Sequence, residues 1–288
     1  MKIEYHVDDY GMFRESSLRI IDCINNGKVN AISLMANSPN LEECMGLLKT
    51  ECKKDVLLSM HLNIMTERPL CIPEEIPDLT DAEGFFNVTY GKLIKAWVFP
   101  SLRKKYRAQI KAELSAQIER ILPYFREQGS VRIDSHRHFH MVPLVFGVIS
   151  EIAKERALDI SYIRIINDKP ALYRGIGRFE HFKPLNIIKL ILLKSFSFID
   201  SLLYPDLYKK GDLDFGCILF SGCMTKKNLG IVLKNAEKNP SVFKRGLELM
   251  FHPGAVLEEE DLNAIHDPED REYMQEGLRS LEAEALKS

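Results

Sequence analysis

Short apolar runs typical of β-strands alternate with helical patterns along the whole chain of 288 residues. The expected strands cover residues 3–7, 29–35, 55–62, 131–135, 161–166, 217–220 and 247–251. Helical spacing covers about 15–26, a stretch that starts near 41, and then 106–126, 143–156 and 268–286. Strands separated by helices predict a mainly parallel sheet with right-handed crossovers. About seven such strands favour a TIM-like (β/α) barrel, distorted or incomplete, over an open doubly wound sheet, and we expect one domain over residues 1–288.

Acidic and histidine side chains recur where these expected strands end. They are Asp8 and Asp9 after the first strand, His61 at the third, Asp134, His136, His138 and His140 at the fourth, and His252 after the last. The carboxyl ends of parallel strands meet at one rim of an α/β barrel. The sequence therefore predicts that these side chains converge on one site.

The first strand ends in two adjacent carboxylates, Asp8 and Asp9, and the chain turns at Gly11. Adjacent residues on a strand point to opposite faces, but at a strand end both side chains can reach one cleft. One carboxylate would then hold a metal ion while the other takes a proton from water. The alternative is a plain solvated turn.

Three histidines lie within five residues, at positions 136, 138 and 140. Alternate residues of an extended chain share a face, and Asp134, two residues earlier, would orient the imidazole of His136. The pattern favours a metal site in which at most two of the three histidines bind the ion. A histidine-rich loop without an ion is the alternative. Two histidines and one carboxylate are a common divalent set that leaves positions open for water and substrate.

His61 and His252 each stand alone at the end of an expected strand. A lone histidine is often a satisfied core or rim residue, but the cluster at 134–140 favours a ligand role for His61. The turn at Pro253-Gly254 would push His252 toward the rim. A histidine there, outside the ligand set, suits a general acid that protonates a leaving amine. A structural role for His252 stays open.

Bulk properties argue against several other functions. The net charge of −2 gives no electrostatic footprint for nucleic acid, and the stretch Arg103-Lys104-Lys105 is typical of a solvated helix face. Six scattered cysteines without a Cys-x-x-Cys pair indicate a reducing compartment. No signal-peptide pattern precedes the first strand, so we expect a cytoplasmic location. The sequence has no nucleotide-binding glycine motif and no Gly-x-Ser-x-Gly elbow.

Two segments differ from the barrel pattern. Residues 64–90 contain Pro69, Pro73 and Pro77 and little periodicity, which is typical of a lid or a binding loop. Residues 184–205 are very apolar but carry charges that make them a poor membrane span. Their polar residues recur at helical spacing and predict an added amphipathic helix: Asn186, Lys189, Ser197 and Asp200. This helix would pack on the barrel, form a homodimer interface or make a peripheral contact for a lipid-linked substrate.

Together these motifs resemble those of the YdjC/ChbG family of carbohydrate deacetylases, which are related to polysaccharide deacetylases. The matching elements are Asp8-Asp9-Tyr10-Gly11, the strand at 27–35, His61-Leu62-Asn63, Glu113 with Gln117, the stretch 134–140 and His252-Pro253-Gly254. They follow the family's order over about residues 3–254. His6-Val7 replaces the small polar residues usual before the two acids, and Ile166 replaces a proline usual after Arg164.

The resemblance implies a divalent metal ion, magnesium or zinc, held by Asp9, His61 and His136. It implies that Asp8 is the general base and that His252 is the general acid.

The implied activity is metal-dependent removal of the acetyl group from an N-acetylated amino sugar or oligosaccharide. Arg164 resembles a family arginine near the site, and we expect Arg164, His138 and Asp134 to contact this substrate. The alternatives are another metal-dependent amidohydrolase, a phosphoesterase, or a degenerate sugar-binding protein.

Overall fold

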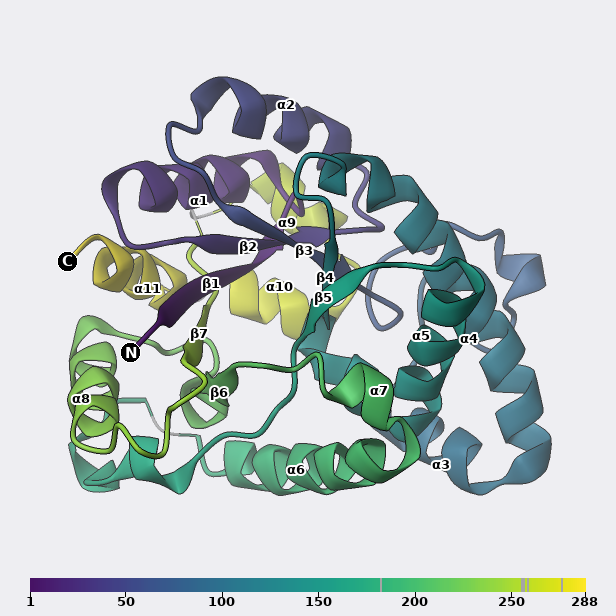
Figure 1. Ribbon diagram of the computed structural model, residues 1–288. Coiled ribbons are helices and arrows are strands. Elements are labelled where there is room, and N and C mark those ends of the chain that lie inside the picture. Colours follow the sequence, from purple (N-terminus) through teal and green to yellow (C-terminus); the bar gives the residue numbers. More distant parts are fainter. Residues whose placement is uncertain (182, 255–256, 258, 276) are drawn as a thin grey trace.

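The computed structural model describes residues 1–181, 183–254, 257, 259–275 and 277–288. Seven strands form one parallel sheet in the order β5-β4-β3-β2-β1-β7-β6. The strands are β1 Ile3–Tyr10, β2 Ala31–Met35, β3 Leu57–Leu62, β4 Val131–Ser135, β5 Ile160–Ile163, β6 Asp214–Gly216 and β7 Leu247–Phe251. The sheet curls toward a barrel (Figure 1). The barrel is incomplete because β5 and β6 are the two edges of the sheet. The predicted TIM-like fold of about seven strands is confirmed.

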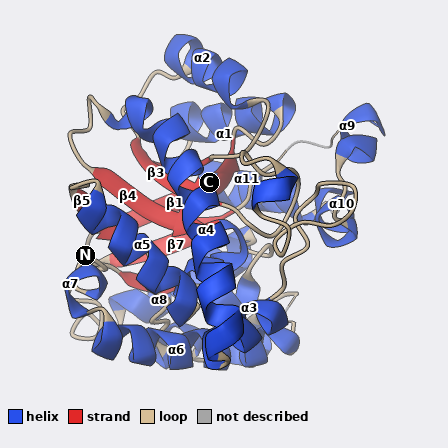
Figure 2. Ribbon diagram, turned by 90° about the vertical axis from the view of Figure 1, so that its right-hand side faces the viewer, coloured by secondary structure: helices blue, strands red, loops and turns tan. Residues whose placement is uncertain are grey.

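Helices surround the strands, which run through the middle of the molecule (Figure 2). The helices are α1 Arg14–Asn26, α2 Leu41–Glu51, α3 Tyr90–Val98, α4 Pro100–Ile121, α5 Pro143–Glu155, α6 Leu185–Leu203, α7 Pro205–Tyr208, α8 Lys226–Glu237, α9 Glu259–Ala264, α10 Pro268–Gln275 and α11 Leu278–Lys287. The residues of α4 whose spacing predicted an apolar face, Ile110, Leu114 and Ile118 among them, are completely buried. This face packs α4 toward β3 and α5.

Several expected elements were wrong in their bounds or number. The first strand continues to Tyr10, and the fifth ends at Ile163 rather than at 166. The sixth strand is 214–216 rather than 217–220, because Cys217 adopts a left-handed φ of 90° that turns the chain into a short 3-10 helix. The helix expected at 106–126 starts at Pro100 and ends at Ile121. The single helix expected at 268–286 is the pair α10 and α11, with residue 276 outside the described residues.

The strand register places the chemically active residues at one end of the sheet. His61 of β3 pairs with Met35 of β2 on one side and with Asp134 of β4 on the other. Asp8 lies near the end of β1, and His252 directly follows β7. All these positions are at or near carboxyl ends of parallel strands, so they lie along one rim of the sheet.

Candidate metal centre and active site

The end of β1 directs two carboxylates into the same cavity. Asp9 has a left-handed φ of 66°, and the pairing of β1 with β2 shifts between Val7 and Tyr10. This break in the regular strand removes the strict alternation of faces. Asp8 and Asp9 therefore both line a cavity of about 1000 Å³ at the rim, as expected for a strand end.

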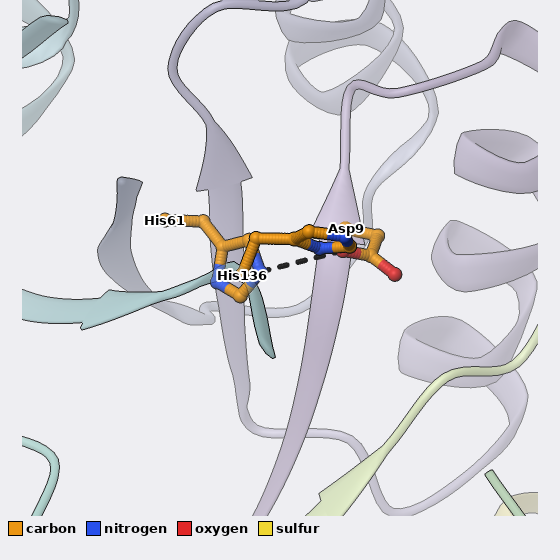
Figure 3. Close-up of side chains that lie close together, drawn as sticks. All are labelled: Asp9, His61 and His136. Atoms are coloured by element: carbon orange, nitrogen blue, oxygen red, sulfur yellow. Dashed lines mark hydrogen bonds and ion pairs between the residues drawn. The ribbon is translucent and has the colours of Figure 1, made fainter. Parts of the chain in front are cut away.

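Asp9, His61 and His136 come together at this cavity (Figure 3). The Asp9 Oδ1 atom lies 3.3 Å from His61 Nε2 and 3.1 Å from His136 Nδ1. The three potential ligand atoms lie within 4.8 Å of one another, and all three side chains are buried. One carboxylate oxygen and two imidazole nitrogens that converge in this way match a common divalent ligand set.

The electrostatics of the triad place positive charge next to Asp9. Burial raises the pKa of Asp9, but hydrogen bonds from His136 and His61 outweigh burial and hold that pKa well below its usual value. Burial lowers the pKa of His61, yet Asp134 and Asp8 raise it to about 10. The pKa of His136 is raised to about 9 by Asp270 and Asp9, again against burial. In the metal-free site both histidines are therefore protonated and positively charged. A metal ion bound by the triad would supply this positive charge in place of the two protons.

Asp134 orients His61, not His136 as expected. The His61 Nδ1–H group donates to Asp134 Oδ1 at 2.6 Å, and this hydrogen bond directs His61 Nε2 toward Asp9. Asp134 also accepts a hydrogen bond from Ser33 Oγ. The other nitrogen of His136, Nε2, instead lies 3.4 Å from Asp270 Oδ2.

The three histidines of the 136–140 stretch do not share a face. The chain there forms a 3-10 turn, in which Arg137 and His138 have left-handed φ values of 53° and 64°. Only His136 joins the triad. His140 is held by Ser135 Oγ at 2.6 Å and by the carbonyl oxygen of Arg164 at 2.8 Å, so it is structural. His138 lines the cavity, and its buried Nδ1 atom has no hydrogen-bond partner among the described residues.

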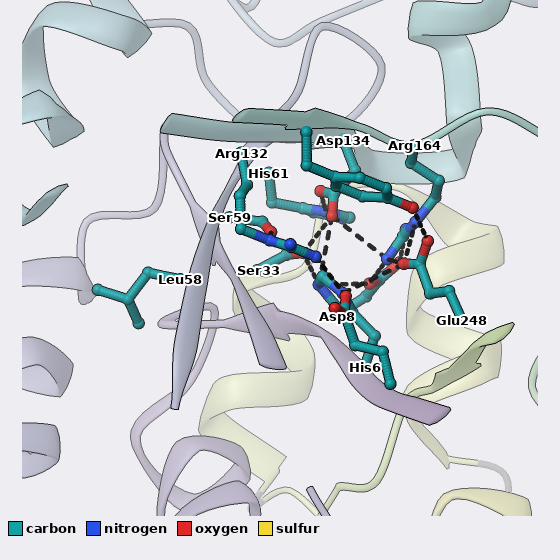
Figure 4. A network of polar contacts seen from close by, with 12 residues as sticks. His6, Asp8, Ser33, Leu58, Ser59, His61, Arg132, Asp134, Arg164 and Glu248 are labelled. Atoms are coloured by element: carbon teal, nitrogen blue, oxygen red, sulfur yellow. Dashed lines mark hydrogen bonds and ion pairs between the residues drawn. The ribbon is translucent and has the colours of Figure 1, made fainter. Parts of the chain in front are cut away.

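Arg164 supports Asp8 from beneath the rim (Figure 4). Its Nη1 and Nη2 groups donate to the two carboxylate oxygens of Asp8 at 2.7 and 2.8 Å. The same guanidinium lies 3.2 Å from Asp134 and 2.7 Å from Glu248. Arg164 and Asp134 are 0% exposed, and neither lines the cavity. Because of this position, we assign Arg164 and Asp134 a role in orienting Asp8 and His61 rather than the expected contact with substrate.

His252 completes the set at the cavity. Its Nε2 atom lies 3.9 Å from Asp8 Oδ2, and 13% of the side chain is exposed. On the opposite side Glu282 accepts a hydrogen bond from the backbone N–H of His252 and lies 3.9 Å from its Nδ1 atom. Burial lowers the pKa of His252 to about 4, against the pull of Asp9 and Asp8. The imidazole is therefore neutral at neutral pH.

Sequence reasoning missed a layer of buried polar residues beneath the rim. The layer comprises Glu4, His6, Ser33, Arg132, Tyr162 and Glu248. His6 lies 3.0 Å from Glu4 and 3.1 Å from Glu248, and its other nitrogen contacts Ser33 Oγ at 2.6 Å. Burial and Arg164 lower the pKa of His6, but Glu248 and Glu4 raise it to about 9. Charged residues inside otherwise apolar strand runs were the signal available for this layer.

Asp270 is a second residue that the sequence did not reveal. It lines the cavity from α10 and faces His136, while its other oxygen accepts a hydrogen bond from Arg137 at 2.7 Å. Burial raises the pKa of Asp270, but His136 and Arg137 lower it to about 2. Because α10 is far from Asp9, His61 and His136 in sequence and carries other charged residues, no local pattern distinguished Asp270.

Two further groups of possible ligands lie in the buried layer: Glu4, His6 and Glu248, and His6, Asp8 and Asp134. Arg132 already pairs with Glu4, and Arg164 pairs with Asp8, Asp134 and Glu248. These guanidinium groups supply the positive charge there. The triad of Asp9, His61 and His136 has no arginine partner in the described part of the chain and all three members face the cavity, so it fits a metal ion best.

Comparison with known proteins finds a family that matches nearly the whole chain. A model of the family described as YdjC-like protein matches residues 2–288. The chain is 31% identical over 169 residues to a carbohydrate deacetylase of Clostridium beijerinckii, which covers 59% of this chain and 63% of that protein. It is 28% identical over 167 residues to a chitooligosaccharide deacetylase of Proteus mirabilis, covering 58% and 61% of the two chains. The matched segments thus span less than two thirds of either relative.

A solved structure from Enterococcus faecalis V583 has a similar fold. It is provisionally described as a cellobiose-phosphate cleavage protein, and the alignment covers 100% of this chain and 90% of that one with a TM-score of 0.63. The sequence identity is only 19%, so the likeness concerns the fold alone.

Proposed function

Because this chain belongs to the YdjC-like family, we propose that it is a metal-dependent hydrolase that removes the acetyl group from an N-acetylated amino sugar or oligosaccharide. One observation carries the proposal: the triad of Asp9, His61 and His136 lies in one cavity with Asp8 and His252. Amide hydrolysis needs a group to accept a proton from water, a group to protonate the leaving amine, and positive charge at the carbonyl oxygen. The cavity has candidates for all three.

The triad would hold a divalent ion such as magnesium or zinc through one carboxylate oxygen and two imidazole nitrogens. Such an ion supplies Lewis-acid polarisation of the amide carbonyl. The hydrogen bond from His61 to Asp134 keeps the His61 Nε2 atom directed toward Asp9, so that both side chains face the proposed ion. Glu248, Asp134 and Arg164 lie behind the site and fix it without entering the cavity.

Asp8 is the base in this proposal. Both of its oxygens face Arg164, which fixes the plane of the carboxylate at the edge of the cavity. From there Asp8 accepts a proton from the water that attacks the acetyl carbon. The new C–O bond forms as that proton leaves the water.

His252 delivers a proton to the departing amine. Since its low pKa leaves the imidazole neutral at rest, the proton must arrive during the reaction. Asp8 is the source in this proposal, since it has just gained a proton and its Oδ2 atom lies 3.9 Å from His252 Nε2; the two side chains must approach to hydrogen-bond distance, or share a water, for the transfer. The C–N bond then breaks as nitrogen takes the proton, which gives acetate and a free amino sugar. His138, with its unpartnered Nδ1 atom at the cavity, is the candidate for substrate contact.

Incubation of the metal-loaded protein with N-acetylated monosaccharides and chitooligosaccharides tests this function. We expect acetate and free amine in equal amounts from at least one member of the panel. Phosphate release from sugar phosphates without acetate from any acetylated sugar would favour the phosphoesterase. Binding of sugars without any product would favour the degenerate sugar-binding protein.

Metal affinity should depend on pH with a definite sign. A metal ion binds neutral imidazole, whereas His61 and His136 hold protons up to pKa values of about 10 and 9 in the metal-free site. Metal binding must therefore displace these protons, and affinity should rise with pH and level off above about pH 10. Isothermal titration calorimetry in buffers of different ionisation enthalpy, at pH 6.5 and 8, would count close to two protons released. Proton-independent binding would contradict the assignment of both histidines.

The segment 64–90 contributes Met65, Val88, Thr89 and Tyr90 to the cavity lining, whereas Phe85 and Phe86 are not part of it. Phe86 is buried in the core, and Phe85 stacks on His266 with ring centroids 3.8 Å apart. Tyr90 lines the cavity and donates a hydrogen bond from its hydroxyl to the carbonyl oxygen of Arg137 at 2.6 Å. The expected role of this segment as a lid stays a prediction, now centred on Tyr90.

We predict that Tyr90→Ala changes the order in which acetylated sugars are preferred, because an aromatic ring in the cavity suits stacking on a sugar face. Relative kcat/KM values over the sugar panel provide the measurement, and Phe85→Ala, which leaves the cavity lining intact, is the control. A uniform loss for Tyr90→Ala that follows a lower melting temperature would assign Tyr90 a purely structural role.

A further inference from the structure

Helix α6 leaves many of its large apolar residues exposed, while its polar residues Ser197 and Asp200 are buried beside Leu193 and Phe196. Its inward residues include Ser197 and Asp200, which are 5% and 0% exposed. Its outward residues form an apolar stripe, which we define as Ile187, Ile188, Ile191, Phe198 and Leu202, with exposures between 42% and 66%. A surface helix normally has the opposite arrangement, with charged and polar residues on its outer face. The predicted amphipathic helix is present. Of its predicted polar residues, Asn186 and Lys189 line the cavity and Ser197 and Asp200 are buried, while Lys194 and Ser195 are exposed among the apolar residues.

The apolar stripe reaches the candidate active site. Ile188, which is 65% exposed, also lines the cavity, together with Asn186, Lys189 and Leu192 of the same helix. One end of the stripe therefore lies at the mouth of the cavity, and the rest follows α6 along the outer margin of the molecule (Figure 1). Several large apolar side chains exposed on one helix mark a candidate interaction site.

Exposed apolar and basic residues at the start of α4 lie close to the far end of α6. Tyr204 directly follows α6. Burial raises the pKa of its hydroxyl, and the positive charges of Arg107 and Arg103 in α4 lower it, so both arginines lie near the end of α6. Beside these arginines Phe99 and Leu102 are 54% and 39% exposed. The stretch Arg103-Lys104-Lys105 is exposed as well, so cations accompany the apolar surface.

We propose that α6 docks on an anionic membrane surface, and that the substrate is an N-acetylated amino sugar carried on a lipid of that membrane. The substrate part of this inference rests on the proposed function. Apolar side chains enter the boundary between head groups and acyl chains, and nearby basic residues pair with anionic head groups. None of the described helices is long and apolar enough to cross a bilayer, which agrees with a helix that lies in the interface. The sugar head group would then meet the cavity at Ile188.

A second copy of the chain is the competing occupant of the apolar stripe. It would cover Ile188 and obstruct the mouth of the cavity, whereas a bilayer would bring substrate to that mouth. The geometry therefore favours the membrane. The oligomeric state of the protein distinguishes the two occupants in the experiment below.

The test measures how much of the 288-residue protein, and of two variants, sediments together with vesicles. The vesicles contain equal parts of phosphatidylglycerol and phosphatidylcholine. The variant Ile191→Ser/Phe198→Ser/Leu202→Ser alters the stripe outside the cavity lining. The control Ile72→Ser/Val242→Ser removes exposed apolar side chains, 58% and 39% exposed, away from α6. We expect the parent and the control to bind, and the stripe variant to partition about tenfold more weakly or worse. Melting temperature and acetate release from a soluble acetylated sugar should stay unchanged in both.

Several outcomes would overturn the inference. The first is a parent protein that stays in the supernatant instead of sedimenting with the vesicles. The second is a stripe variant that binds the vesicles as well as the parent does. The third is a parent that is a dimer, binds no vesicles and becomes monomeric when the stripe is substituted. Vesicle binding without acetate release from any soluble or lipid-linked sugar would refute the proposed function and leave membrane docking intact. Acetate release without vesicle binding would refute only the docking.

Discussion

We predict that replacing His136 with alanine abolishes binding of the proposed divalent ion and reduces the proposed acetate release about a thousandfold or more. A metal ion contributes several kcal/mol to stabilisation of transition-state charge, and each 1.36 kcal/mol is a factor of ten in rate. The same result is expected for His61→Ala and Asp9→Ala, because each side chain supplies one of the three converging atoms. Metal content per protein molecule and kcat/KM are the two measurements.

The control for this series is His181→Ala, since His181 is exposed and lies outside the cavity lining. It should keep the full metal content and the parental rate. Full metal occupancy in the His136→Ala protein would contradict the account, and His138 would then be the only other histidine of the 136–140 stretch at the cavity. His140 is not an alternative ligand, because both of its nitrogens are already hydrogen-bonded.

Asp8→Asn will keep the metal but lose most of the turnover, because an amide cannot accept the proton of the attacking water. Removal of a general base typically reduces the rate by about 10²–10⁴. Metal content, substrate affinity and kcat of the purified variant separate this effect from loss of binding. Arg164 still has Asp134 and Glu248 as partners, so the variant should fold.

Glu272→Gln provides a matched control, because Glu272 also lines the cavity as a carboxylate but has no place in the proposed proton transfers. It should retain nearly the parental kcat. If Asp8→Asn hydrolysed the sugar at the parental rate, Asp8 would not be the base, and the transfer of a proton from Asp8 to His252 would fail with it.

The fold was predictable because short, largely buried strand-like runs alternate with helical patterns along the chain. The strand and helix bounds at 131–135, 247–251 and 143–155 are close to those expected. The errors occur where one residue changes the backbone. Cys217, with its left-handed φ, ends the strand before the apolar run at 217–220, and nothing in the side-chain pattern distinguishes that turn from a strand.

The site was predictable to the extent that it depends on strand ends. Asp8, Asp9, His61 and His252 all lie at the rim because parallel strands place their carboxyl ends together. The side-chain partners were not predictable, because they depend on backbone turns and on contacts distant in sequence. Asp134, for example, serves His61 across the sheet instead of His136 along the chain.

The least predictable parts of the site come from single backbone angles and distant segments. The left-handed φ values at Arg137 and His138 separate three histidines that an extended chain would align. Asp270 reaches His136 from a helix more than a hundred residues later in the sequence. The burial of Ser197 and Asp200 in α6 is likewise set by tertiary packing, since helical spacing alone does not say which face is covered.

Diffraction from crystals of the zinc-loaded protein, measured at the zinc absorption edge, tests the central claim most directly. We predict an anomalous peak bounded by Asp9 Oδ1, His61 Nε2 and His136 Nδ1, with metal–ligand distances of about 2.0–2.2 Å. A strong peak at the group of Glu4, His6 and Glu248 instead, or no peak at the triad in protein that releases acetate, would contradict the account.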